Sequence, residues 1–193
     1  MTTPVLTMPA EEAAWIREAY DAADTILEYG SGGSTCLAAE MPGKTIFSVE
    51  SDPDWAESMT AHLATHPPAS TVRIHHVDIG PTGPWGYPRD DSHWSRFHRY
   101  PLSVWDREDF QHPDVVLVDG RFRVACLLAV LFRASRPVSV YFDDYADRQS
   151  YHAVERMIAP RETRGRMARF DVQPVPVPAH DLTWVLAAFA QSR

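Results

Sequence analysis

The chain has 193 residues, of which 45% are hydrophobic and 23% are charged. This size and composition predict one soluble globular domain over residues 1–193 with a full hydrophobic core. The net charge of -8 argues against a protein that binds nucleic acid phosphates, because such surfaces are basic. The two cysteines lack metal-ligand spacing, the N-terminus does not resemble a signal peptide, and no apolar run approaches the length of a membrane span. We therefore expect a cytoplasmic protein without a membrane or nucleic-acid partner.

Apolar residues at helical spacing after Pro9 predict a first helix that ends at Ala22 or Ala23. The segment Thr25–Tyr29 is apolar enough for a buried strand, and three glycines follow among the next four residues. A short helix is predicted at Ser34–Glu40. This order of strand, tight turn and helix is typical of a ligand-binding turn, because glycines allow close approach and a helix start presents free N–H groups.

A second strand is predicted at Thr45–Glu50, followed by a helix with Asp52 as its cap and Pro53 in its first turn. A third strand is predicted at Val72–Asp78. The next segment, 80–104, is rich in glycine, proline and aromatic residues, and no regular element fits it. Loops this long are often functional. We interpret it either as a lid or substrate-binding loop, or as a structural loop that its aromatic residues pin to the body.

The second half of the chain again alternates short apolar runs with helical periodicity, which predicts an α/β fold with a mostly parallel sheet and helices on both faces. A cluster of arginines in this half is interpreted as a solvated connection. The predicted elements are a strand at Asp114–Asp119, a helix after Gly120, a strand at Val138–Phe142, a helix at Asp147–Ile158, the arginine connection (Arg161, Arg164, Arg166 and Arg169), an extended segment at Ala168–Val177 and a last strand at Leu182–Phe189.

Acidic residues stand at the ends of successive predicted strands. Because the carboxyl ends of parallel strands meet at one edge of a sheet, these acids should line one crevice beside the glycine turn. Such a crevice suits a cationic cofactor better than a phosphate. A dinucleotide fingerprint would need a third glycine where Thr35 stands. The acids are Glu28, Glu50, Asp78 and Asp119, with Asp143 and Asp144 after a fifth strand.

Four short motifs resemble those of the class I S-adenosylmethionine-dependent methyltransferases. They are Leu27–Ser34, Val49-Glu50, Val77–Ile79 and Leu117–Gly120, and the resemblance covers residues 25–145. It implies a three-layer Rossmann-like fold with a seven-stranded, mostly parallel sheet, an antiparallel last strand and helices on both faces. It also implies S-adenosylmethionine as the cofactor.

The resemblance further implies roles for individual residues near the cofactor's amino-acid part and ribose. Gly30 and Gly32, with Ser31 between them, would bring the backbone close to the amino-acid part. Glu28 would help to bind the ammonium group, directly or through water. Glu50 would accept hydrogen bonds from both ribose hydroxyls, an arrangement natural to a carboxylate.

On the adenine side, the resemblance places Ser51 and Asp52 beside the base. Asp78 would accept a hydrogen bond from the adenine amino group, and the N–H of Ile79 would face a ring nitrogen. Asp119 would border both the transferred methyl group and the substrate.

The residues leave the chemistry of the transfer step open. Asp119, Asp143 and Asp144 resemble the acidic trio of metal-dependent O-methyltransferases, in which a divalent cation lowers the pKa of a substrate hydroxyl. That subgroup usually has an amide where this chain has Asp144, so a metal is not favoured and no metal ligand is assigned.

Arginines near the crevice offer another clue. Arg121, together with Arg123, Arg148 and Tyr151, could hold a substrate carboxylate or phosphate by bidentate pairing. The alternative is that these arginines only pair with neighbouring aspartates. As a general base, His98 and His152 are the best-placed histidines. The catalytic candidates are Asp119, Arg121, Asp143 and His152.

The leading hypothesis is S-adenosylmethionine-dependent methyl transfer to a small-molecule acceptor that could be anionic. Two alternatives remain: a methyltransferase-like protein that binds a nucleoside without catalysis, and a nicotinamide-dependent oxidoreductase. The oligomeric state is left open, with a homodimer as one option.

Overall fold

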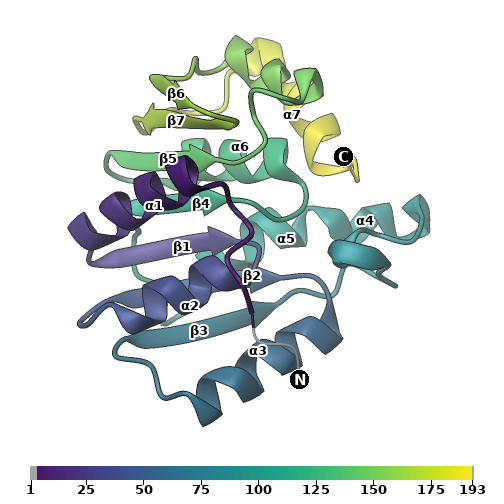
Figure 1. The fold of residues 1–193 in the computed structure, drawn as a ribbon. Helices are drawn as coiled ribbons and strands as arrows, with labels where there is room; N and C mark the ends of the chain where they lie inside the picture. Colours follow the sequence, from purple (N-terminus) through teal and green to yellow (C-terminus); the bar gives the residue numbers. More distant parts are fainter. Residues whose placement is uncertain (1–3, 193) are drawn as a thin grey trace.

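Seven strands form one sheet at the centre of the protein, in the order β3-β2-β1-β4-β5-β7-β6 (Figure 1). The structure is a computed structural model that describes residues 4–192. Strands β1 to β5 pair in parallel with one another, and β7 runs antiparallel to both β5 and β6. The strands are β1 (Thr25–Tyr29), β2 (Thr45–Glu50), β3 (Thr71–His76), β4 (Val115–Val118), β5 (Val138–Phe142), β6 (Glu162–Arg164) and β7 (Met167–Val172).

Helices cover both faces of this sheet, because successive strand residues point to opposite sides and both sides are apolar. In β1, Ile26 belongs to the cluster built with α1 and α2, and Leu27 belongs to the cluster built with α6. Figure 1 shows α1 and α2 in front of the sheet and α5 and α6 behind it. The helices are α1 (Ala10–Ala22), α2 (Gly33–Glu40), α3 (Pro53–Thr65), α4 (Trp94–Phe97), α5 (Arg99–Leu102), α6 (Arg123–Arg133) and α7 (Leu182–Phe189).

This architecture confirms the predicted three-layer α/β fold, with its mostly parallel sheet and antiparallel last strand. The strands predicted at 25–29, 45–50 and 138–142 have the predicted bounds. Within residues 4–192 no helix is both long and apolar enough to cross a membrane.

Three of the predicted elements are wrong. The last strand predicted at Leu182–Phe189 is helix α7, with Val185 and Ala188 buried three residues apart. The helix predicted at Asp147–Ile158 is a 3₁₀ helix at Gln149–Arg156. The extended segment is a strand only as far as Val172, and it pairs with the short strand β6, which the sequence did not indicate.

The prediction that no regular element fits the segment 80–104 is wrong. The segment folds into the short helices α4 and α5 and three 3₁₀ turns, the last of which ends just beyond it. Its inner side chains, such as Phe97 and Tyr100, are buried in the core. Its outer side chains are not: Trp85 is 82% exposed and Trp94 is 59% exposed. In Figure 1 this segment projects beyond the end of the β1 arrow, at the carboxyl edge of the sheet.

Candidate functional site

The glycine turn after β1 meets the turn after β4. Gly30 has a φ of 107°, a conformation that side chains rarely adopt, and a Cβ there would lie 2.7 Å from the backbone nitrogen of Gly120. Around Gly32, by contrast, a Cβ would find no atom within 4 Å. The described chain therefore packs tightly at Gly30 and leaves space at Gly32.

Glu28 lies beneath this turn, on the side of α1 and α2. Its carboxylate accepts hydrogen bonds from the hydroxyls of Tyr20, at 2.7 Å, and Thr35, at 2.6 Å, and it is fully buried. Burial raises the pKa of Glu28, against the lowering effect of the Thr35 and Tyr20 hydrogen bonds. The Thr35 hydroxyl oxygen in turn accepts a hydrogen bond from the N–H of Gly32. Glu28 thus supports the turn from below. Its predicted contact with the ammonium group, directly or through water, stays a prediction.

Glu50 stands at the end of β2 with only 7% of its surface exposed. Its Oε1 accepts hydrogen bonds from the backbone N–H groups of Ser51, at 2.7 Å, and Asp52, at 2.9 Å. Its Oε2 receives only a long contact, 3.3 Å, from the N–H of Ser31. Burial raises the pKa of Glu50. The carboxylate is therefore oriented by the backbone and keeps acceptor capacity on Oε2.

The segment 80–104 reaches over this carboxylate. The Ser51 hydroxyl donates a hydrogen bond of 2.9 Å to the carbonyl of Gly86, and a Cβ on Gly86 would lie 3.2 Å from Oε1 of Glu50. Gly86 has a φ of 69° and its neighbour Trp85 a φ of 62°. A non-glycine residue at positive φ is strained, and such strain tends to occur at functional sites.

Asp78 lies farther out. Its side chain is 62% exposed, Oδ2 accepts a hydrogen bond of 2.7 Å from Arg96, and Oδ1 accepts one of 2.9 Å from the N–H of Gly80. Ile79 is buried. The hydrogen bond from the Gly80 N–H lowers the pKa of Asp78, and the charge of Arg96 lowers it further. Burial acts in the opposite direction, but the pKa stays below its ordinary value. Its predicted contact with adenine, like that of the Ile79 N–H, stays a prediction.

Three aspartates and three arginines form an ionic cluster at the ends of β4 and β5. Asp143 is fully buried, and Arg166 from β6–β7 binds both of its oxygens, at 2.9 and 2.7 Å. Arg123 donates to Oδ1 of Asp119 at 3.0 Å. The third aspartate, Asp144, forms an ion pair of 3.2 Å or less with each of the three arginines, Arg123, Arg148 and Arg166.

Asp119 is the most exposed of the three aspartates in the cluster, with 29% of its side chain exposed. Its pKa rises to about 7, because burial disfavours the charged form. Arg123 opposes this shift, and the neighbouring carboxylates of Asp143 and Asp144 add to it. A carboxylate with such a pKa exchanges its proton near neutrality, as a general base must.

A cavity of about 210 Å³ opens next to this cluster. Gly120, Arg121 and Arg123 line one side of it, and Tyr151 and Arg148 line another. Tyr87 from the segment 80–104 closes it further, with its ring 3.9 Å from the guanidinium carbon of Arg121. The structure thus brings Arg121 into a cavity beside Asp119.

Comparisons with known proteins support one family. No protein-family model matches the chain, and no curated protein matches it. A methyltransferase-like protein from Silicibacter pomeroyi is 51% identical, with 99% of each chain covered and a TM-score of 0.95. This chain belongs to the class I S-adenosylmethionine-dependent methyltransferase superfamily.

More distant methyltransferase structures share the fold. An O-methyltransferase from Streptomyces achromogenes, solved in complex with SAM, is 18% identical over 87% of this chain and 82% of its own, with a TM-score of 0.61. An O-methyltransferase from Bacillus cereus, in complex with SAH, is 13% identical over 86% of this chain and 84% of its own, with a TM-score of 0.56.

Within this methyltransferase fold, other predicted catalytic residues lie away from the cavity. Asp143 is enclosed and held by Arg166. His152 stacks on the ring of Tyr145, with 4.7 Å between ring centroids, and its Nε2 lies 3.0 Å from the Tyr145 carbonyl oxygen. His98 is exposed on the segment 80–104. Neither histidine lines the cavity.

The three aspartates Asp119, Asp143 and Asp144 are paired with arginines in the structure. Among residues 4–192 no group of three His, Cys, Asp or Glu side chains is placed to hold a metal ion. Each of these aspartates pairs with an arginine: Arg123 pairs with Asp119 and Asp144, and Arg166 pairs with Asp143. The interpretation of Arg166 as part of a solvated connection is wrong, because this arginine binds the buried carboxylate of Asp143.

Proposed function

We propose that this methyltransferase-fold protein transfers a methyl group from S-adenosylmethionine to a small-molecule acceptor. The observation that carries the proposal is the contact between Gly30 and Gly120, which joins the glycine turn to Asp119 and the cavity. A cofactor held at the turn would therefore have its reactive end beside the residue that borders the cavity. The complexes of the distant O-methyltransferases with SAM and SAH support the same assignment.

The residues of the crevice fit this cofactor. The space beside Gly32 would receive its amino-acid part, because no atom of residues 4–192 lies within 4 Å of where a Cβ would stand. Oε2 of Glu50 would accept from the ribose hydroxyls, since Oε1 is already committed to two backbone N–H groups. When bound, the cofactor supplies an electrophilic methyl group on a positively charged sulfur.

The protein's own contribution is alignment and proton transfer. Binding both reactants side by side converts the transfer into an effectively unimolecular step. Asp119, in its ionised form, would take the proton from an acceptor hydroxyl at a carboxylate oxygen, and Arg123 would hold that carboxylate in place. The segment 80–104 would act as a lid, because Gly86 already contacts Ser51 beside Glu50. We retain a single domain, a cytoplasmic location and the absence of a nucleic-acid partner as parts of this proposal.

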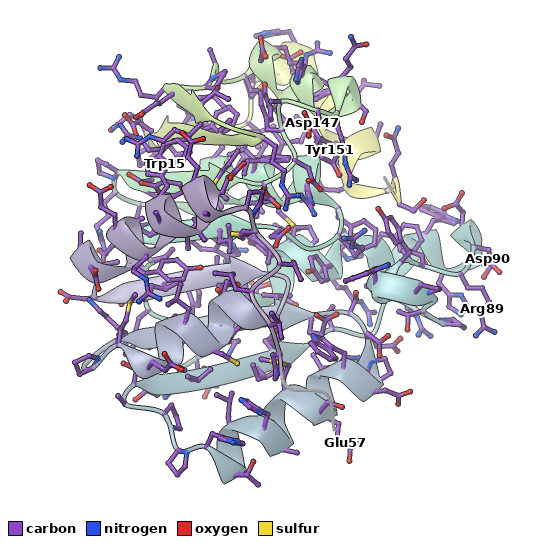
Figure 2. All side chains as sticks on the ribbon, viewed as in Figure 1. Trp15, Glu57, Arg89, Asp90, Asp147 and Tyr151 are labelled. Atoms are coloured by element: carbon purple, nitrogen blue, oxygen red, sulfur yellow. The ribbon has the colours of Figure 1, made fainter. Side chains whose placement is uncertain are left out.

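Calorimetric titration with S-adenosylmethionine tests the proposal. Glu50→Ala should weaken binding by about 10- to 100-fold or more, because hydrogen bonds to a charged group contribute about 1.5–3 kcal/mol. Glu57→Ala is the matched control: it removes the same charge from the exposed face of α3, where Figure 2 shows Glu57 away from the crevice. Circular dichroism should show that both variants fold.

No heat and no thermal shift with millimolar S-adenosylmethionine would overturn the assignment. Tighter binding of NADH than of S-adenosylmethionine would favour an oxidoreductase instead. If the cofactor binds but no methyl group moves from a labelled donor to any member of a broad metabolite panel, the protein is a binding module.

A further inference from the structure

The arginines around the cavity differ in whether they form ion pairs with acidic residues. In the ionic cluster three carboxylates face three guanidiniums, so the charges of Arg123, Arg148 and Arg166 are matched. Arg121 lines the cavity and forms no ion pair with any residue in the range 4–192. Its charge is therefore left over, in a protein whose net charge is -8.

Arg121 is also held as if for a ligand. Its guanidinium lies over the ring of Tyr87, 3.9 Å from the ring centroid, and this contact fixes the plane of the group. Its Nε is buried and has no hydrogen-bond partner among the described atoms. A buried donor without a partner is costly, at about 1–3 kcal/mol, and calls for an explanation.

The surroundings of Arg121 favour an anion. Among residues 4–192 no acidic residue lines the cavity with the three arginines Arg121, Arg123 and Arg148. Burial would raise the pKa of Tyr87, yet that pKa lies below its ordinary value because Arg121 and Arg148 stabilise the ionised form. The cavity thus has a positive potential, and its tyrosine and arginine faces suit a flat group.

We infer that the acceptor carries a carboxylate or a similar small oxyanion, which Arg121 binds by paired N–H groups inside this cavity. This inference rests on the proposed function, because it names the acceptor of the same transfer. The turn Asp119–Arg121 would then set the geometry: the residue bordering the methyl group and the residue holding the anion are two positions apart. Tyr87 would complete the subsite from the lid side, and Tyr151 from the opposite side.

Direct binding tests the inference without knowledge of the true acceptor. Benzoate and phenyl phosphate are the probes for a carboxylate and a phosphate, and benzamide is the neutral counterpart of benzoate. Each is titrated into the full chain by calorimetry, with and without saturating S-adenosylhomocysteine. We expect at least one anion to bind, and benzamide to bind at least about 10-fold more weakly than benzoate, as loss of a charge-assisted pair implies.

Arg121→Gln should weaken the anion by about 10- to 100-fold, since hydrogen bonds to charged groups contribute about 1.5–3 kcal/mol. Arg121→Lys should recover part of the affinity, because it keeps the charge but not the planar fork. Arg89→Gln is the matched control, since it removes one guanidinium from the exposed tip of the same lid, where Figure 2 labels Arg89 far from Tyr151. The control should bind as the native protein does.

Two results would overturn the inference: neither anion binds although S-adenosylhomocysteine does, or Arg121→Gln binds the anion as well as Arg89→Gln. The first leaves the proposed function intact. Failure of S-adenosylhomocysteine to bind would instead remove the proposed function, and the titrations without it would still decide whether Arg121 binds an anion.

Discussion

Replacing Arg166 with methionine should be among the most damaging changes near the site. The substitution removes both hydrogen bonds that Arg166 gives to the side chain of Asp143, at 2.9 and 2.7 Å. The Asp143 side chain is 1% exposed, so water cannot replace them. Breaking a buried pair costs about 3–5 kcal/mol, and we take the lower end because the Arg166 side chain is 29% exposed.

A loss of about 3 kcal/mol in the free energy of unfolding corresponds to a decrease in Tm of about 6–12 °C for a chain of this length. Urea denaturation followed by circular dichroism measures it. Arg161→Met is the control, because Arg161 is 72% exposed and lies 3.9 Å from Asp171 in a surface pair, so its loss should cost less than about 1 kcal/mol. Adding Asp143→Asn to Arg166→Met should recover part of the stability, since it removes the stranded charge. Equal, small losses in Arg166→Met and Arg161→Met would refute the argument that a buried charge pair holds this edge of the sheet.

Two further predictions concern the same edge. The carboxyl carbon of Asp119, followed by ¹³C NMR, should titrate with a midpoint near pH 7; because this folded-state pKa is raised above its ordinary value, the stability it contributes is lost as pH rises from about 4 to 7. A midpoint near pH 4 would contradict this, and Asp119→Asn should remove the signal. Gly120→Ala should cost about 1–3 kcal/mol by overpacking, because its Cβ would collide with the Tyr100 hydroxyl and lie 2.8 Å from the Tyr29 carbonyl oxygen. Gly83→Ala, whose Cβ would meet only an atom 3.8 Å away, should cost far less in the same urea experiment.

The bounds of the strands β1, β2 and β5 could be predicted from the sequence because they depend on local signals. Apolar runs such as Val115–Val118 are short, rich in β-branched residues and bounded by polar residues, which favours buried strands. The acid at the end of a run then lies at the carboxyl edge by topology alone. No knowledge of the partner strands is needed for either step.

The C-terminal elements were harder because their signals are ambiguous. The run Leu182–Phe189 is apolar except for Thr183, so its length and composition fit a buried strand as well as a helix. In the structure this run is a helix, with Leu186 62% exposed and Val185 buried. Its buried side joins the core cluster of α6, a contact that the run itself does not indicate. Strand β6, Glu162–Arg164, is three polar residues at the sheet edge, and no periodicity can indicate so short a strand.

The chemistry of the site depends on pairings across the chain, which no local pattern contains. The sequence shows aspartates after two strands and arginines after one of them, and it cannot tell which are neutralised. Arg166 reaches Asp143 only because β7 turns back antiparallel beside β5, so an arginine 23 positions later meets the end of that strand. Arg166, Arg123 and Arg148 pair with aspartates, whereas Arg121 forms no ion pair with a residue in the range 4–192. The specificity of the cavity therefore follows from the ion pairs that surround it, and a change in any of those pairs should alter which anion Arg121 can hold.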